Sequence, residues 1–269
     1  SLKQEIESIS DGYMLDVDGF RTEKKDWLRD QIVSMTEKRF KVARAWAKET
    51  KWDLMIACEI GTDRIHHGFW SSYDPGHRSY EPGNRFSHVI PDYYRSLDTR
   101  IAEVIEAAGP STAVMIVSDH GAKAMQGGFR INEWLAREGD LALKKRPASP
   151  RPLQAEDVDW ERTRAWGAGG YCAKIFFNIS GREPQGLLSP SEVPSYRSDL
   201  AARLEKIRDA SGNPMDTRVF SPLEIYGDCR AYPPDLIAYL GNLSWRSLAE
   251  VGSERLHSLT NDTGPDDAN

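Results

Sequence analysis

The 269-residue chain is long enough for one large α/β domain or two smaller ones, and its 39% hydrophobic content can fill a sizeable core. Its formal net charge of −6 excludes the strongly basic balance that binding to a nucleic-acid backbone requires. No apolar run approaches the ~18 residues of a membrane span, and no signal peptide precedes the first element, so we expect no membrane partner and a cytoplasmic location.

The first periodic segment predicts a long amphipathic helix over 23–49, which follows a short polar lead over 1–20. Its apolar residues form one stripe, with lysines and arginines opposite, and we interpret the charged side as a solvated face. The stripe consists of Trp27, Leu28, Ile32, Met35, Phe40, Val42, Ala43, Trp46 and Ala47.

A buried strand is predicted next over 52–59, and it runs into a segment that carries two metal-competent side chains, Asp63 and His67. These two residues are four positions apart, so one helical turn would aim both at one point. A carboxylate and an imidazole in this spacing form a plausible half-site for a divalent metal. His66 then points elsewhere, and we expect it to form a local hydrogen bond.

A second pair of the same kind follows a second predicted strand. A Gly- and Pro-rich loop over 71–86 leads to an amphipathic helix over 87–108, whose stripe includes Ile90, Tyr94 and Leu97. The apolar run 113–117 is typical of a buried strand, and it ends at Asp119, His120 and Gly121. Taken alone, this Asp could equally cap a helix and this His could form only a hydrogen bond.

The order helix, strand, helix, strand predicts an α/β fold with a mostly parallel, doubly wound sheet and helices on both faces. Ligands of such sheets bind beyond the carboxyl ends of the strands. Two strand-end Asp/His pairs therefore predict a metal site made by Asp63, His67, Asp119 and His120.

After Gly121 the pattern becomes more irregular, and we predict shorter elements there. A short helix over 132–139 uses Asn132 and Trp134 for packing rather than for substrate contact. Gly167 to Gly170 can form either a hinge or a plain turn. The remaining predictions are strands over 174–178, 217–220 and 235–240, a helix over 190–208, and reduced, buried, inert thiols at Cys58, Cys172 and Cys229.

Several stretches of the chain resemble the type I phosphodiesterase/nucleotide pyrophosphatase family of the alkaline phosphatase superfamily. They include Glu59 to Trp70, Ser118 to Gly121, Gly128 to Leu135, Pro234 to Ile237 and Asn261 to Asn269. The resemblance runs in order over nearly the whole chain from about residue 20. It implies a single alkaline-phosphatase-like domain over 1–269, incomplete in this chain, with 122–215 as an insertion or cap region.

The resemblance also implies two divalent metal ions, zinc or alternatively manganese. One ion would take Asp63 and His67, and the other would take Asp119 and His120. Family members add a C-terminal histidine to the first ion, and an N-terminal aspartate and a Thr or Ser nucleophile to the second. Here no nucleophile context occurs in residues 1–20, and His257 is a poor substitute for the missing histidine because it precedes the last motif.

The expected function is therefore hydrolysis of a small-molecule phosphodiester or phosphate ester at a two-metal site. Because no catalytic residue is identified, we expect the chain to be a fragment with little activity alone. One alternative is a non-catalytic binding protein that retains the fold. Another is a phosphomutase or sulfatase of the same superfamily.

Overall fold

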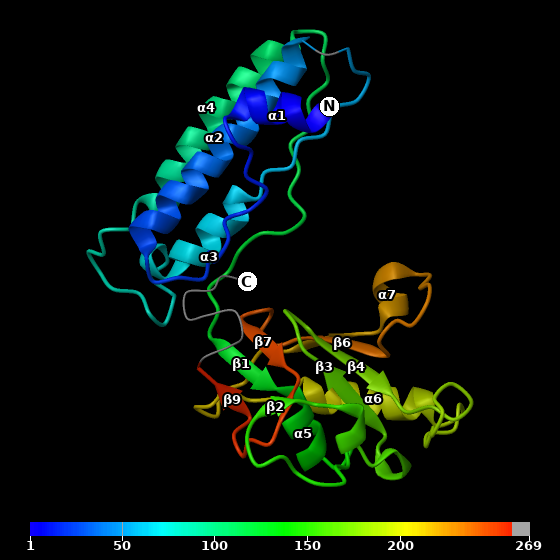
Figure 1. Ribbon diagram of the computed structural model, residues 1–269. Helices are drawn as coiled ribbons and strands as arrows, with labels where there is room; N and C mark the ends of the chain where they lie inside the picture. Colours follow the sequence, from blue (N-terminus) through cyan, green and yellow to red (C-terminus); the bar gives the residue numbers. More distant parts are fainter. Residues whose placement is uncertain (50, 260–269) are drawn as a thin grey trace. The chain divides into compact units, whose positions relative to one another are not determined.

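The computed structural model describes residues 1–49 and 51–259, which fall into two compact units. Unit 1 comprises Ser1–Ala124, and unit 2 begins at Met125 (Figure 1). None of the described helices combines the length and the apolar character needed to cross a bilayer. The mixture of helices and sheets confirms the predicted α/β class. The single-domain assignment with 122–215 as an insertion stays a prediction.

Unit 1 is helical, and its longest elements are the two helices predicted from apolar periodicity. Its helices are α1 (Leu2–Ser10), α2 (Lys25–Glu49), α3 (Gly61–Tyr73) and α4 (Val89–Ala108). Helices α2 and α4 lie along one another in Figure 1. Gly109 ends α4 with a φ of 83°, a conformation that glycine adopts at little cost.

The core of unit 1 is a single cluster contributed by three helices and the segment before α2. The cluster consists of Val17, Leu28, Ile32, Met35, Ile65, Phe69, Ile90, Tyr93 and Leu97. Two residues of the predicted stripes are wrong: Trp27 in α2 is 41% exposed, and in α4 Tyr93 rather than Tyr94 is buried. Both positions satisfy the three-or-four spacing from Ile90, and Tyr94 instead contacts His66 at the surface.

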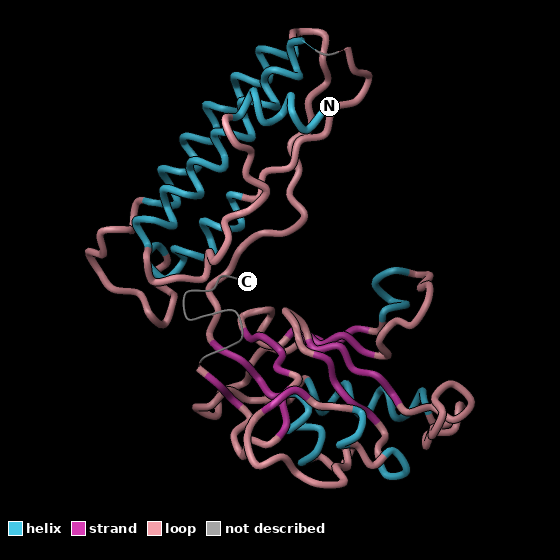
Figure 2. Tube along the Cα trace, viewed as in Figure 1, coloured by secondary structure: helices cyan, strands magenta, loops and turns pink. Residues whose placement is uncertain are grey.

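The two strands predicted in unit 1 are not formed. Segments 52–59 and 113–117 are loops in Figure 2, and neither makes a backbone–backbone hydrogen bond to another described residue. Their apolar side chains face solvent: Ile56 is 83% exposed, Met115 is 85% exposed and Val117 is 78% exposed. A strand exists only when a neighbouring strand completes its hydrogen-bond ladder, and the described residues of unit 1 provide none.

Unit 2 holds all the strands of the described chain, in three sheets. The largest has the order β3 (Ala165–Ala168), β4 (Ala173–Phe177), β6 (Leu236–Tyr239), β5 (Arg218–Phe220). The second joins β7 (Trp245–Leu248), β1 (Gly127–Arg130) and β9 (His257–Ser258), and the third pairs β2 (Arg151–Pro152) with β8 (Glu250–Val251). Pairing is parallel between β1 and β7, and the other five ladders of the described residues are antiparallel. The predicted mostly parallel, doubly wound sheet is therefore wrong for the described residues, although the α/β class holds.

Helices α5 (Ile131–Arg137), α6 (Val193–Leu204) and α7 (Pro222–Tyr226) accompany these sheets, together with the short 3-10 turns η1 (Ala155–Asp157) and η2 (Trp160–Arg162). The predicted hinge or turn at Gly167 to Gly170 is wrong at its start, because Gly167 pairs with Ile175 inside the β3–β4 ladder. A Cβ on Gly167 would lie 2.6 Å from Ile131 Cγ2, so glycine here permits close packing of α5 on the sheet.

Candidate functional site

Helix α3 carries the first Asp/His pair. Asp63 lies in its first turn and His67 one turn later, and Asp63 Oδ1 is 3.4 Å from His67 Nε2. The other oxygen of Asp63 accepts a hydrogen bond from Arg64. A carboxylate in the first turn is favoured by the helix dipole, so the sequence places Asp63 where its negative charge also supports the helix.

The pKa of Asp63 is lowered, chiefly by its hydrogen bond with His67. Burial opposes this shift, and the positive charges of His67, Arg64 and His120 reinforce it. Asp63 is therefore an anion at neutral pH, as a metal ligand must be. His66 Nε2, in contrast, is 3.1 Å from Tyr94 Oη, so the predicted hydrogen bond is formed, but with a residue of α4 rather than locally.

A buried polar network fixes the start of α3. Glu59 Oε1 accepts hydrogen bonds from Gly61 N at 2.6 Å, from Thr36 Oγ1 at 3.1 Å and from Tyr93 Oη at 3.2 Å. Burial and the nearby Glu59 charge raise the pKa of Tyr93 far above its usual range, so the phenol stays a donor. Sequence reasoning missed this network, although a glutamate two positions before a helix-starting glycine suggests a cap.

The second pair lies on the loop that leaves α4. Asp119 Oδ2 is 3.7 Å from His120 Nε2, and the two side chains are 90% and 64% exposed. The ring Nδ1 of His120 is 2.9 Å from the carbonyl oxygen of Gly121. The predicted strand end is absent here, so these side chains are held by local contacts of the loop.

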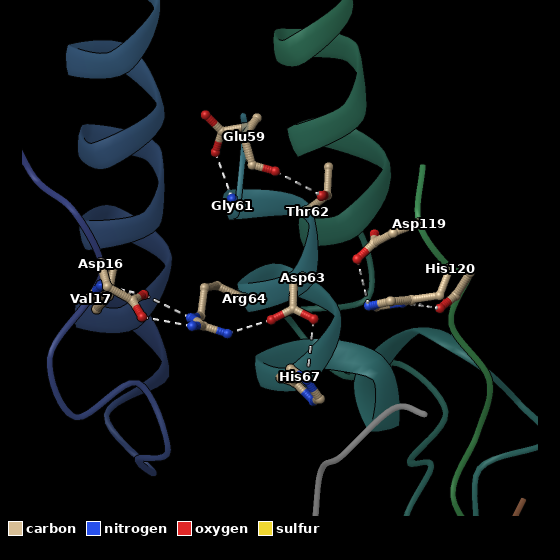
Figure 3. Close-up of polar contacts among 11 residues, drawn as sticks. Asp16, Val17, Glu59, Gly61, Thr62, Asp63, Arg64, His67, Asp119 and His120 are labelled. Atoms are coloured by element: carbon tan, nitrogen blue, oxygen red, sulfur yellow. Dashed lines mark hydrogen bonds and ion pairs between the residues drawn. The ribbon is translucent and has the colours of Figure 1, made fainter. Parts of the chain in front are cut away.

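The structure brings the two pairs to one side of α3 (Figure 3). Burial is the main cause of the lowered pKa of His66, and His120 adds to it; His120 also makes a small contribution to the lowered pKa of Asp63. All four predicted residues belong to unit 1. His257 lies in unit 2, where its Nε2 is 2.8 Å from the carbonyl oxygen of Arg208 and its ring packs on Phe129 and Trp245.

The donor chemistry of these pairs fits a borderline divalent cation such as zinc, which binds imidazole and carboxylate. Two donors of one tetrahedral zinc ion, each about 2.0–2.1 Å from it, lie roughly 3.3 Å apart. The 3.4 Å between Asp63 Oδ1 and His67 Nε2 matches this distance between two zinc donors. The 3.7 Å between Asp119 Oδ2 and His120 Nε2 is slightly longer. Within residues 1–49 and 51–259, no group of three or more His, Cys, Asp or Glu side chains forms a ready-made metal cluster. Each pair thus offers two candidate donors, and both separations also suit an ordinary ion pair between imidazole and carboxylate.

The segment before α2 contacts α3 through Arg64. Asp16 accepts hydrogen bonds from Arg64 Nε at 2.7 Å and from Arg64 Nη2 at 2.6 Å. The Arg64 guanidinium also lies over the Phe20 ring, 4.2 Å from its centroid. Arg64 thus joins residues 16–20 to α3 and holds the carboxylate of Asp63 in place.

Comparison with protein-family models gives a match to "Type I phosphodiesterase / nucleotide pyrophosphatase" over residues 4–266. Comparison with curated proteins and with solved structures gave no match in either case.

Proposed function

The chain belongs to the type I phosphodiesterase / nucleotide pyrophosphatase family, and from that premise we propose that Asp63, His67, Asp119 and His120 serve a two-metal phosphodiester hydrolase. The family implies hydrolase activity on small-molecule phosphodiesters. The metal dependence is our proposal. Its main support is that two Asp/His pairs lie on one side of α3, and that the oxygen–nitrogen distance within each pair is close to the distance between two donors of one zinc ion.

In this proposal each pair holds one divalent ion, zinc or alternatively manganese. When bound, the two ions would supply positive charge to the attacking and leaving oxygens of the displaced phosphoryl group. Arg64 holds Asp63 through one carboxylate oxygen and leaves the other toward His67. Glu59, through Gly61, fixes the helix start from which Asp63 projects.

We further propose that polypeptide outside these 269 residues contributes the nucleophile and the remaining ligands, and that this chain alone has little activity. The loops that lead to both pairs, 52–59 and 113–117, support this reading because they expose apolar side chains and make no backbone–backbone hydrogen bond to another described residue. Such segments gain stability when another strand pairs with them. A cytoplasmic location remains part of the proposal, and the free thiols of Cys58, Cys172 and Cys229 agree with it. The prediction that these thiols are buried is wrong for Cys58, which is exposed.

Zinc binding tests the site. We expect the purified chain to bind zinc in titration calorimetry, and Asp63→Asn and His120→Ala each to weaken one binding event on the order of tenfold or more. Asp98→Asn and His88→Ala, which change one exposed residue of each type on or beside α4, serve as matched controls and should leave binding unchanged. Equal loss in the controls, or no stoichiometric zinc in the unmodified chain, would favour the alternative of a non-catalytic binding protein.

Activity tests the second half of the proposal. We expect the chain, loaded with zinc or manganese, to hydrolyse bis(4-nitrophenyl) phosphate hardly faster than the free ions do. Robust turnover by a preparation whose intact mass matches the 269 residues would show that the chain supplies its own nucleophile.

A further inference from the structure

A second candidate site lies in unit 2, at the edge of the largest sheet, and shares no residue with the Asp/His pairs. It is a cavity of about 260 Å³ lined by Trp160, Trp166, Asn178, Glu183, Pro184 and Gln185. Ligand sites for drug-sized molecules begin near ~300 Å³, so this cavity suits a small head group.

Two tryptophans form the aromatic walls. Alternation along β3 buries Ala165 and Gly167 and leaves Trp166 half-buried on the outer face, where its ring stacks on Phe176 across the ladder with centroids 5.7 Å apart. Trp160, in η2, stands perpendicular to Trp166, with an interplanar angle of 86° and a centroid separation of 5.1 Å. The two indole rings therefore make a right-angled corner.

The corner is held by a buried amide that has no donor left for a ligand. Asn178 is 1% exposed, and its Nδ2 lies 2.9 Å from the carbonyl oxygens of Trp160, Thr163 and Gln185, which share its two hydrogens. These bonds fix both the Trp160 wall and the segment that carries Gln185. Asn178 is thus a positioning residue for the cavity.

The charge at the cavity is negative. Glu183 Oε1 accepts a hydrogen bond from Arg182 Nε at 2.8 Å, but Arg182 also makes two hydrogen bonds to Asp235, at 2.8 and 2.7 Å. One guanidinium therefore faces two carboxylates, and a net negative charge remains. The segment next to Trp160 adds the carboxylates of Glu156 and Glu161, whereas Asp157 is paired with Arg151 and Asp159 with Arg162.

We propose that this cavity binds a small organic cation of the quaternary ammonium class, with its alkyl groups against the Trp160–Trp166 corner and Glu183 compensating its charge. Indole faces attract cations, and quaternary ammonium groups are recognised by aromatic surfaces of this kind. The negative charge disfavours anions.

Tryptophan fluorescence titration tests the proposal, with choline and tetramethylammonium as probes and 3,3-dimethylbutan-1-ol as the uncharged isostere of choline. We expect saturable millimolar binding of both cations and at least tenfold weaker binding of the alcohol. Trp166→Leu should weaken choline binding by tenfold or more, and Glu183→Gln by severalfold. Trp27→Leu and Glu205→Gln, which change a tryptophan of unit 1 and an exposed glutamate of unit 2, should leave it unchanged.

Equal binding of the alcohol and choline would overturn the proposal, as would equal losses in the control variants. If circular dichroism shows that Trp166→Leu is unfolded, Glu183→Gln and Trp160→Phe replace it in the comparison. Trp160→Phe keeps an aromatic face and should weaken choline binding less than Glu183→Gln does. Unchanged choline affinity in folded Glu183→Gln would also overturn it. The metal site plays no part in this assay, so failure of one proposal leaves the other standing.

Discussion

At the scale of single residues, Gly61 shows how closely the start of α3 is fitted to its surroundings. A Cβ at this position would lie 2.0 Å from Tyr93 Oη, 2.5 Å from Glu59 Oε1 and 2.7 Å from Thr36 Oγ1. All three atoms belong to the hydrogen-bond network of Glu59, so none can move without breaking a bond. A methyl group therefore cannot be accommodated without moving the helix that carries Asp63.

We predict that Gly61→Ala lowers the free energy of unfolding of unit 1 by about 2–3 kcal/mol, the upper range for overpacking a buried site. Urea denaturation followed by circular dichroism measures this change. Gly121→Ala is the control, because nothing lies within 4 Å of its added Cβ. Equal stability of the two variants would show that the network yields to the methyl group at no cost.

The ion pair between Asp16 and Arg64 predicts a pH dependence. Hydrogen bonds from Arg64 hold the pKa of Asp16 below its usual 3.8 in the folded chain. As the pH falls, Asp16 is therefore protonated in the unfolded chain before it is protonated in the folded chain. The stabilisation by the Asp16–Arg64 ion pair is complete above about pH 4, and it is lost as the pH falls through the pKa of Asp16 in the folded chain. We expect Asp16→Asn to destabilise the chain at pH 6 and much less at pH 3, in thermal unfolding scans. Asp18 is exposed, and Asp18→Asn should change the unfolding temperature by the same small amount at pH 6 and at pH 3.

At the scale of secondary-structure elements, Asn132 links α5 to the edge of the largest sheet. Its Nδ2 donates to Gly167 O at 2.9 Å, and its Oδ1 accepts from Gly167 N at 2.7 Å, so the side chain replaces a strand neighbour for β3. Asn132 is fully buried. The prediction that this residue serves packing agrees with these contacts.

We predict that Asn132→Asp destabilises unit 2 by about 2–3 kcal/mol, because the carboxylate cannot donate to Gly167 O and leaves that buried acceptor unsatisfied. Asn84→Asp is the matched control, since Asn84 Oδ1 accepts from Phe86 N and an aspartate keeps that bond. A chemical denaturation midpoint that shifts equally in both variants would contradict the role assigned to Asn132.

The elements also show what the sequence could and could not predict. Helices α2 and α4 follow from local apolar periodicity, and the spacing of Asp63 and His67 within one helical turn is equally local. Segments 52–59 and 113–117 have strand-like composition, but composition cannot supply the neighbour that a ladder needs. The network of Thr36, Glu59 and Tyr93 joins three separate segments, so no local pattern encodes it.

At the scale of the whole molecule, the exposed apolar loops of unit 1 are an association hazard. Residues 113–117 combine high strand propensity, no charge and exposed apolar side chains, the features of a segment that pairs with other chains. Nothing in the described part of unit 1 covers them. The isolated chain should therefore associate as its concentration rises.

We predict that Met115→Lys combined with Val117→Lys reduces this association, measured as the apparent mass by light scattering over a concentration series. Like charges on adjacent chains oppose pairing of this segment. Leu223→Lys combined with Tyr226→Lys changes two exposed apolar residues of α7 and should have a smaller effect. If only the α7 variant dissociates the chain, the self-pairing surface is in unit 2.

The parallel pairing of β1 with β7 has a consequence for how the protein is made. Gly127 stands opposite Trp245, so one sheet joins the first residues of unit 2 to nearly its last described ones. A ribosome adds roughly 5–20 residues per second. Strand β1 is therefore synthesised several seconds before β7, the strand with which it pairs. Unit 1, whose contacts close earlier along the chain, can complete its helical core during synthesis. We expect nascent chains stalled before residue 245 to protect unit 1 from protease while unit 2 is still digested.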